Sequence, residues 1–369
     1  MKRRVIFVTH NNLDPSDGVW KKINSQVKSL RNLDFNVDFF YMDKKNIIVD
    51  NGEGIKEISL GSRNKYLFYK IIKEYIQENK REAYHLAYIR KPHGGAFVIY
   101  LSGLISFLKR FGSDVIMEIP TYPYKNEINT LSGKISDVIF DMALPFFRKK
   151  IDKIVFLGQA DNDIWGIKSI QISNGIDIND ARLLEEKNNI TNDFIFVGVA
   201  NLAFWHGYDR IITGIKNYKG SKNVIFKIAG NSEPEYSRLK KLVASLELES
   251  NVIFEGKVSG RILESILQSA DVCVDALGRH RSGNNINNSI KSKEYSARGL
   301  PFIKSHYDNS FSGQEEFILQ FNADDSPIDI SKVIFWRENL NSGFSLRERD
   351  FAMKNLTWEK QFEFLLGDK

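Results

Sequence analysis

The sequence predicts an α/β protein of two domains, each built on a mainly parallel, doubly wound sheet. The chain has 369 residues, and at roughly 100–200 residues per domain this length favours two domains. Short apolar runs alternate with longer segments whose apolar residues recur at helical spacing, which is typical of a parallel sheet covered by helices. The alternation runs to about residue 150 and then starts again, which indicates a second domain of similar kind.

The first half begins with Val5–Thr9, a continuous apolar run typical of a buried parallel strand. Apolar residues at 19, 23, 27 and 30 then follow at helical spacing, which predicts a helix over 19–33. Further strands are expected at 36–41, 86–89 and 115–119, and further helices at 67–79 and 96–111.

The second half repeats this pattern. Strands are expected at 153–157, 169–172, 194–199, 224–229, 252–255, 272–274 and 301–304, and helices at 209–218, 235–246, 262–269 and 289–298. The segment 345–366 is predicted to be one amphipathic, aromatic-rich helix. In open sheets of this kind ligands bind at the carboxyl ends of the strands, so two such domains predict a ligand cleft between them.

Composition excludes several classes of protein. The single cysteine, Cys273, excludes a disulfide framework and a multi-cysteine metal site, and it suits a reducing compartment. The basic N-terminus leads into an apolar run of only about four residues, so we interpret it as a first strand rather than a signal peptide. The sequence has no run of about 18 apolar residues, the length that a spanning helix needs.

Charge is distributed unevenly along the chain. Residues 1–160 hold 26 Lys+Arg and 17 Asp+Glu, whereas residues 161–369 hold 26 and 29, so balances of +9 and −3 make up the net +6. A basic half is suited to an anionic ligand or an anionic membrane surface, although a solvated surface would look the same. Nucleic acid is not expected as a partner, because the basic residues are scattered without interleaved exposed aromatics.

Polar loops follow several of the predicted strands. Neither half has a GxGxxG or Walker lysine motif, so dinucleotide and P-loop chemistry are not supported. The loop after the first strand ends in Gly18 at a helix start, where a ligand can approach free backbone N–H groups; an ordinary turn is the alternative. A second loop, after 194–199, contains Asn201 and His206, and a lone histidine there is more often structural.

The densest group of polar residues spans 277–295. Asn288 or Ser289 can cap the predicted helix, whose first N–H groups, Ile290 among them, can bind a phosphate oxygen. Glu294 lies about one turn further on, where a carboxylate can accept hydrogen bonds from ribose hydroxyls. The cations available for a diphosphate are Arg279, Arg281 and Lys291, and the loop also offers the amide of Asn284. A solvated loop before a surface helix is the alternative.

A family resemblance emerges from motifs taken in order along residues 170–305. They include an Asn-Gly-Ile-Asp turn at 174–177, Trp-His-Gly-Tyr-Asp-Arg at 205–210, Ile-Ala-Gly ending at Gly230, and Lys-Ser-Lys-Glu-Tyr at 291–295. This set resembles the donor domain of family 4 glycosyltransferases of the GT-B fold, retaining enzymes that use a nucleotide-activated sugar. The resemblance implies two Rossmann-like domains facing across a cleft, with a C-terminal helix that crosses back to the first.

The resemblance assigns roles to individual residues. Glu294 matches the second glutamate of the family's E-x7-E signature, which holds the ribose, but Ile286 stands where the first glutamate would be. Asn201 and His206 stand where the family places an Arg and a Lys beside the diphosphate. Arg279, Arg281 and Lys291 are the expected replacements, and His206 would contribute if it were protonated.

In the first domain the resemblance is looser, and it points to Arg90, His93 and Glu118 as residues lining the acceptor or the donor sugar. No metal or other cofactor is expected, because GT-B enzymes usually need none. Asp161 and Asp163 have the spacing of a metal-binding DxD motif, but they are interpreted as part of a solvated turn.

The sequence therefore predicts an acceptor-side domain at 1–165, completed by a returning helix at 346–369, and a nucleotide-sugar donor domain at 166–345. The implied activity is retaining transfer of a sugar to a lipid-linked saccharide in surface polysaccharide synthesis. The expected location is cytoplasmic, with or without peripheral contact to the inner face of the cell membrane through 99–111 and 144–150. The alternatives are a GT-B nucleotide-sugar epimerase or phosphorylase, and a non-catalytic sugar-nucleotide-binding protein.

Overall fold

A computed structural model of the chain describes residues 3–14, 17–61, 65–79, 83–92, 94–95, 97–125, 128, 130–160, 163–187, 191–283 and 285–367. The chain divides into two compact units. Unit 1 comprises residues 1–175 and 358–369, and unit 2 comprises 176–357. The sequence-based boundaries at 165 and 345 lie ahead of these divisions, because β8 (Ser169–Gln171) pairs with the sheet of unit 1 and α10 (Phe344–Asn355) packs on α8 (Ile290–Arg298) in unit 2.

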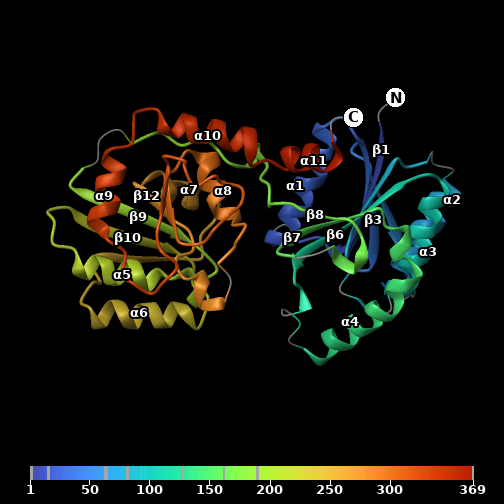
Figure 1. Ribbon diagram of the computed structural model, residues 1–369, viewed down its shortest axis with the longest axis horizontal. Coiled ribbons are helices and arrows are strands. Elements are labelled where there is room, and N and C mark those ends of the chain that lie inside the picture. The colour runs from blue at the N-terminus through green and yellow to red at the C-terminus, as the bar shows by residue number, and fades with distance from the viewer. Residues whose placement is uncertain are drawn as a thin grey trace. The chain divides into compact units, whose positions relative to one another are not determined.

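Unit 1 is built on an eight-stranded sheet in the order β4-β3-β2-β1-β5-β6-β7-β8 (Figure 1). Its strands are β1 (Arg4–Asn12), β2 (Asn36–Asp43), β3 (Asn46–Asp50), β4 (Ile55–Ser59), β5 (Leu86–Arg90), β6 (Asp114–Tyr122), β7 (Lys153–Gly158) and β8. Its helices are α1 (Gly18–Asn32), α2 (Phe68–Glu78), α3 (Phe97–Arg110), α4 (Leu131–Ala143) and α11 (Trp358–Leu366). The pairing is parallel except along β2-β3-β4, which is antiparallel.

Alternate residues of β1 supply the two faces of this sheet. Val5 and Phe7 point into a core with α1 and α11, whereas Ile6 and Val8 point into a second core with α2 and α3. Because both faces are buried, the strand reads as a continuous apolar run, as expected for a parallel sheet covered by helices. The pair β3 and β4 and helix α4 were not predicted from the sequence.

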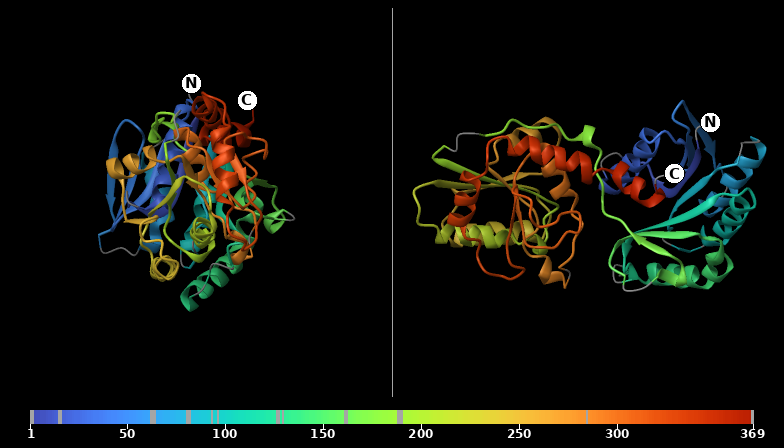
Figure 2. Two further views of the ribbon diagram at one scale, coloured as in Figure 1. Left: turned by 90° about the vertical axis from the view of Figure 1, so that its left-hand side faces the viewer. Right: turned by 45° about the horizontal axis from the view of Figure 1, so that its top comes forward.

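Unit 2 is built on a six-stranded parallel sheet in the order β11-β10-β9-β12-β13-β14. Its strands are β9 (Asp193–Val199), β10 (Asn223–Ala229), β11 (Val252–Gly256), β12 (Val272–Val274), β13 (Phe302–Lys304) and β14 (Ile318–Gln320). Its helices are α5 (Tyr208–Asn217), α6 (Glu235–Ser245), α7 (Gly260–Gln268), α8, α9 (Ile330–Glu338) and α10. Both views of this unit show α10 on one side of the sheet and α5 and α6 on the other (Figures 1 and 2).

The predicted final helix at 345–366 is two helices. Leu356 is buried, and its carbonyl accepts a hydrogen bond of 3.0 Å from the N–H of Ile176. Thr357 also forms an isolated parallel β-bridge with Ile176, so the backbone leaves the helical conformation at this point. As a result α10 belongs to unit 2, and α11 alone returns to unit 1.

Trp358 anchors α11 in the core that it shares with α1, and it is 1% exposed. We predict that Trp358→Ala lowers the free energy of unfolding by about 3–5 kcal/mol, because the substitution leaves a large cavity. Phe364 on the same helix is 69% exposed. Phe364→Ala is the matched control, with an expected change within about 0.5 kcal/mol. Urea unfolding measures both; equal effects would mean that α11 does not complete this core.

Candidate functional site

The sheet of unit 2 places its candidate site where the strand order reverses. From β9 the chain builds β10 and β11 on one side, and then β12, β13 and β14 on the other. In open α/β sheets the crevice beside such a switch point, at the carboxyl ends of the strands, is the usual ligand site. The loops that follow β9 and β12 therefore frame the candidate site.

These two loops are joined by backbone hydrogen bonds. The N–H of Leu277 donates to the carbonyl of His206 at 2.8 Å, and the N–H of Gly278 donates to that of Trp205 at 3.2 Å. Gly207 adopts a left-handed conformation with φ 64°, and a Cβ there would lie 2.6 Å from the nitrogen of Gly278. Only glycine fits both requirements, so Gly207 fixes the close approach of the loops.

His206 is a neutral side chain in this site. Its Nδ1 lies 3.1 Å from the backbone nitrogen of Ala203 and 3.2 Å from the carbonyl oxygen of the same residue. Burial, reinforced by the nearby charge of Lys291, lowers the pKa of His206 to about 3. The condition under which His206 would supply positive charge, protonation of its ring, is therefore not met near neutral pH.

Asp275, which sequence reasoning missed, lies directly after β12 and is fully buried. Its Oδ1 lies 3.1 Å from Nζ of Lys291 and accepts a hydrogen bond of 2.8 Å from the N–H of Ala276. Its Oδ2 accepts a hydrogen bond from the hydroxyl of Ser292 and lies 3.7 Å from Nε2 of His306. Burial alone would raise the pKa of Asp275, but Lys291, His306 and the hydroxyl donors hold it well below its ordinary value.

The start of α8 has no side-chain cap. Ser289 is the N-cap residue, as the sequence suggested, but its side chain makes no capping hydrogen bond and its hydroxyl instead stabilises the carboxylate of Asp275. The first turn of a helix carries backbone N–H groups that favour an anion. Ile290, the first residue of α8, is partly exposed. This helix start therefore remains suited to a phosphate oxygen.

Lys291 and Lys293, on the same helix, differ in their surroundings. Lys291 is partly exposed and contacts Asp275, so part of its charge is balanced. Lys293 is completely buried in an ion pair of 2.9 Å with Asp308, which makes it structural. Lys291 is thus the lysine of this helix whose side chain reaches the surface, although its Nζ is buried beside Asp275.

The two arginines of the loop after β12 also differ. Arg281 donates to Asp209 at 2.9 Å, to Asp325 at 2.7 Å and to the carbonyl of Phe204 at 3.1 Å. Its guanidinium is already balanced by two carboxylates, and it ties this loop to α5. Arg279 lies over the ring of Trp205, with 5.9 Å between its guanidinium carbon and the ring centroid. In the structure Arg281 therefore links this loop to Asp209 and Asp325, a role that the sequence did not predict.

The remaining predicted residues of unit 2 lie around these loops. Glu294 is exposed on α8, one turn beyond its start, and Asn201 is exposed after β9. Asn288 precedes the N-cap of α8, in a loop anchored by a hydrogen bond of 2.9 Å from the N–H of Asn287 to the carbonyl of Tyr307. Gly230, at φ 146°, approaches the loop after β9 so closely that a Cβ would lie 2.0 Å from the carbonyl oxygen of Ala200. Asn284 lies outside the described residues.

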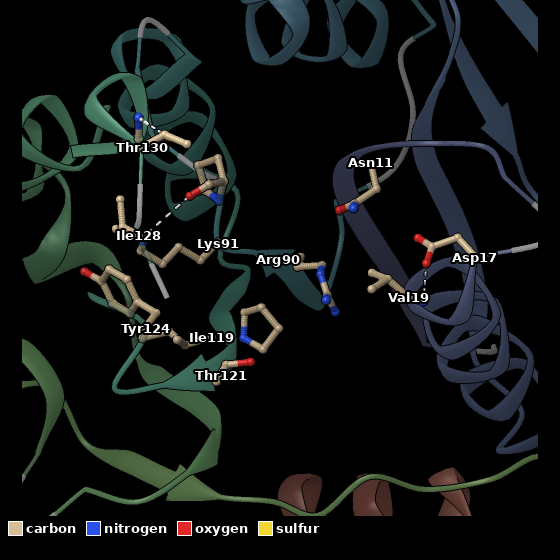
Figure 3. A pocket seen from close by; sticks show the side chains of 13 residues that line it. Asn11, Asp17, Val19, Arg90, Lys91, Ile119, Thr121, Tyr124, Ile128 and Thr130 are labelled. Atoms are coloured by element: carbon tan, nitrogen blue, oxygen red, sulfur yellow. Dashed lines mark hydrogen bonds between the residues drawn. The ribbon is translucent and has the colours of Figure 1, made fainter. Parts of the chain in front are cut away.

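Unit 1 has a cavity of about 690 Å³ at its own switch point, between the loops after β1 and β5. Figure 3 shows Arg90 and Lys91 on one wall and Asn11 and Asp17 on another. Nζ of Lys91 lies 4.0 Å from the ring centroid of Tyr124, and burial lowers the pKa of this lysine to about 8. The cavity thus combines cationic groups with hydrogen-bonding and aromatic side chains.

Glu118 lies behind this cavity instead of lining it, which corrects the expectation from the sequence. Its carboxylate is fully buried and accepts hydrogen bonds from Arg90 at 2.7 Å and from Gln26 and Tyr88 at 2.9 Å each. Burial alone would raise the pKa of Glu118, but Arg90 and Lys22 hold it below its ordinary value. Glu118 positions Arg90, which does line the cavity. His93 lies outside the described residues.

The structure does not support an anion-binding site at Gly18. It is the first residue of α1, but the carboxylate of Asp17 caps that helix and accepts a hydrogen bond of 3.2 Å from the N–H of Val19. A negative group already occupies the position that a phosphate would take. The expectation that Gly18 binds the nucleotide is therefore not supported by the local geometry.

A smaller cavity of about 290 Å³ also lies in unit 1, and sequence reasoning missed it. Lys44 and Lys65 line it together with His10, Gly94 and Ser136. Two lysines in one small cavity favour an anionic group. Their positions, at 44 and 65 in the sequence, gave no local motif by which to find them.

Comparison with known proteins shows which family model part of the chain matches and which fold it shares. Residues 180–277 match the family described as glycosyl transferases group 1. The whole chain has the GT-B fold of glycosyltransferases. No curated protein matches its sequence. The family 4 subtype remains a resemblance.

Solved structures share the enzyme's fold over its whole length. A glycosyltransferase from Rickettsia africae matches with a TM-score of 0.63 and 13% identity, over 99% of this chain and 97% of that one. Sucrose-phosphate synthase from Thermosynechococcus elongatus matches with a TM-score of 0.61 and 12% identity, over 99% and 98%. HepE from Anabaena, in complex with UDP, matches with a TM-score of 0.58 and 11% identity, over 99% of each chain.

The described residues show neither a membrane-spanning helix nor a cluster of metal ligands. None of their helices has the length and apolar character needed to cross a membrane. Within the same part of the chain, the His, Cys, Asp and Glu side chains form no group of three or more that could hold a metal ion. Of the residues at Asp161–Asp163, the first two lie outside the described ranges, and the carboxylate of Asp163 accepts a hydrogen bond of 3.0 Å from the N–H of Ser169.

We predict that the His206 ring does not titrate between pH 5 and 8, because its pKa of about 3 lies far below this range. Histidine-labelled NMR would show constant ring shifts in the folded enzyme, whereas the same ring in urea should titrate near its ordinary pKa of about 6.5. The unfolded chain then binds the additional proton, so His206 lowers folding stability as pH falls from about 6.5 towards 3. A folded-state titration near pH 6 would restore His206 as a candidate cation.

Proposed function

We propose that the enzyme transfers a sugar from a nucleotide-sugar donor to a lipid-linked saccharide acceptor, with retention of configuration. The product belongs to the synthesis of a surface polysaccharide such as capsule, exopolysaccharide or O-antigen. The observation that carries this proposal is the uncapped start of α8, which stands beside Lys291 at the switch point of unit 2. That arrangement suits a nucleoside diphosphate. Structures with the same fold were solved with UDP, in HepE, and with ADP, in starch synthase IV from Arabidopsis thaliana.

The donor is held, in this proposal, by the loops after β9 and β12. The diphosphate accepts hydrogen bonds from the first N–H groups of α8 and an ionic contact from Lys291. Glu294, exposed one turn further on, accepts hydrogen bonds from the ribose hydroxyls. Gly230 allows the backbone of its turn to approach the ligand closely. No metal ion or other cofactor takes part.

Transfer breaks the bond between the anomeric carbon and the donor phosphate oxygen and forms a bond to an acceptor hydroxyl. The hydroxyl proton moves to the leaving phosphate, so no protein base is required. Negative charge grows on the diphosphate as the bond breaks, and Lys291, Arg279 and the start of α8 stabilise it. His206 adds a neutral imidazole ring beside the ligand. These groups replace the Arg and Lys whose positions are taken here by Asn201 and His206.

The acceptor is held by unit 1. The saccharide occupies the cavity of about 690 Å³, where Arg90 is fixed by Glu118 and can donate to sugar hydroxyls. The phosphate groups of a lipid-diphosphate carrier occupy the smaller cavity beside Lys44 and Lys65. The excess of positive charge in residues 1–160 favours an anionic acceptor at an anionic membrane face.

A donor screen tests this function. Purified enzyme, a lipid-diphosphate saccharide and a panel of UDP-, ADP-, GDP- and dTDP-sugars should release nucleoside diphosphate with one donor, and release should persist in EDTA. Glu294→Ala should weaken nucleotide binding roughly tenfold, through loss of hydrogen bonds to a charged group. Glu249→Ala is the control, an exposed glutamate ahead of β11. Tight binding of one donor without turnover would instead favour the non-catalytic sugar-nucleotide-binding alternative.

The smaller cavity has a test of its own. Lys44→Met and Lys65→Met together should raise KM for a lipid-diphosphate acceptor roughly tenfold or more while kcat changes little, because the lost contacts are made equally in ground state and transition state. Lys45→Met serves as the control, since this exposed neighbour does not line the cavity. An unchanged KM in the double variant would place the acceptor phosphates elsewhere.

A further inference from the structure

The outward face of α4 is apolar, which is unusual for a helix on the surface of a protein. Leu131 and Met142 are 76% and 71% exposed, and Ile135 and Val138 are each more than half exposed. Spaced at i, i+4, i+7 and i+11, these four side chains form one stripe along the helix. We call them the α4 stripe. It contains no charged residue, whereas the solvent face of a helix normally carries charged and polar side chains.

The α4 stripe faces away from the core of unit 1. Phe140 is the fully buried anchor of α4, and at about 100° per residue it lies on the opposite side of the helix from the stripe. In Figure 1, α4 lies at the lower border of unit 1, with α3 as its helical neighbour. The exposed stripe is therefore not an extension of the core.

The apolar surface continues beyond α4. A groove of about 490 Å³ runs between α3 and α4, and its lining includes Val98, Ile99 and Met142. It ends at Phe146, which follows α4 and is 73% exposed. Contiguous exposed apolar surface of this kind marks an interaction site rather than ordinary surface composition.

Cations flank this surface. Lys134 is exposed on α4, and Arg148 and Lys149 are exposed shortly after Phe146, beyond the buried Phe147. Neither carboxylate of α4 offsets these cations. Asp137 is buried, and Asp141 forms an ion pair of 2.8 Å with Lys125. An apolar stripe bordered by Lys and Arg is the pattern of a helix that lies in the interface of an anionic membrane.

We propose that the α4 stripe and Phe146 insert into the surface of an anionic phospholipid bilayer, with Lys134, Arg148 and Lys149 contacting its headgroups. The sequence suggested 99–111 and 144–150 as membrane-facing segments; the structure adds α4, which sequence reasoning missed, as the element that joins them. This surface rests on the proposed function, since it would hold the acceptor side of the enzyme where a lipid-linked saccharide is found.

A bilayer fits this surface better than a second copy of the chain. In a twofold dimer formed through the α4 stripe, the flanking cations of both copies would be brought towards one another, and like charges at an interface disfavour association. An anionic headgroup layer instead complements the same cations. The groove between α3 and α4 offers additional apolar surface to acyl chains.

Site-specific fluorescence provides the first test. Cys273 is buried, so Val138→Cys supplies an accessible thiol on the stripe for an environment-sensitive dye. Phe335→Cys, on α9 of unit 2, is the matched control at another exposed apolar position. With vesicles of equal phosphatidylcholine and phosphatidylglycerol, the dye at 138 should shift to the blue and brighten, and the dye at 335 should not. Equal responses at both positions, or a response at neither, would overturn the proposal.

Vesicle co-sedimentation of the full chain provides the second test. Ile135→Gln, Met142→Gln and Phe146→Gln combined should weaken binding to the anionic vesicles at least about tenfold, because three apolar side chains no longer enter the bilayer. Ile262→Gln, Phe335→Gln and Leu346→Gln combined, at exposed positions of unit 2, should leave binding unchanged. Binding should also fade with salt and be weak on pure phosphatidylcholine.

The two tests separate this proposal from the proposed function. Vesicle binding requires no donor or acceptor, and transfer to an acceptor with a short, soluble lipid requires no vesicle. The stripe variants should keep that soluble activity and lose only the vesicle binding. Unchanged vesicle binding in the stripe variants would overturn the proposal, as would a dimer in solution that the same substitutions dissociate, which would make the α4 stripe an interface between copies.

Discussion

The candidate donor site depends on one buried carboxylate. Asp275 is held at the end of β12 without contact with solvent, and an ion in that position is tolerated only when it is fully paired. It meets this requirement by contacting Lys291 and Ser292 on α8 and His306 beyond β13. The position of α8 relative to the sheet is thereby fixed. The hydroxyl of Ser289 is also directed at Asp275, which leaves the helix start open.

Unit 1 uses a related arrangement with a different result. Glu118 is as completely buried as Asp275, but its partners Arg90, Gln26 and Tyr88 come from β5 and α1 instead of from a helix start. The carboxylate holds one guanidinium at the wall of a cavity. In both units, therefore, a buried acid at the carboxyl edge of the sheet sets the position of a neighbouring cation, Lys291 in unit 2 and Arg90 in unit 1.

Much of the fold was predictable, because strands buried on both faces are continuous apolar runs and their helices carry an apolar stripe. The helix α4 was missed because its apolar residues face outward as well as inward. In the candidate site, the residue types were predictable and their states were not. The sequence next to Arg281 gives no indication of its acidic partners, because Asp209 and Asp325 approach it only in the folded chain. Likewise, burial lowers the pKa of His206 and so removes its charge near neutral pH. Burial of this kind cannot be deduced from the neighbouring residues in the sequence.

The return of α11 to unit 1 has a consequence for how the polypeptide is made. Unit 2 is continuous in sequence, whereas unit 1 obtains Trp358, Phe362 and Leu365 from the last part of the chain. Domains commonly fold in order as the chain leaves the ribosome, the N-terminal one first. Here the synthesis of unit 1 begins before that of unit 2 and is completed after it. Until residues 358–366 have been synthesised, the core face between α1 and its sheet lacks its covering helix, so the nascent chain exposes apolar surface that the folded unit buries.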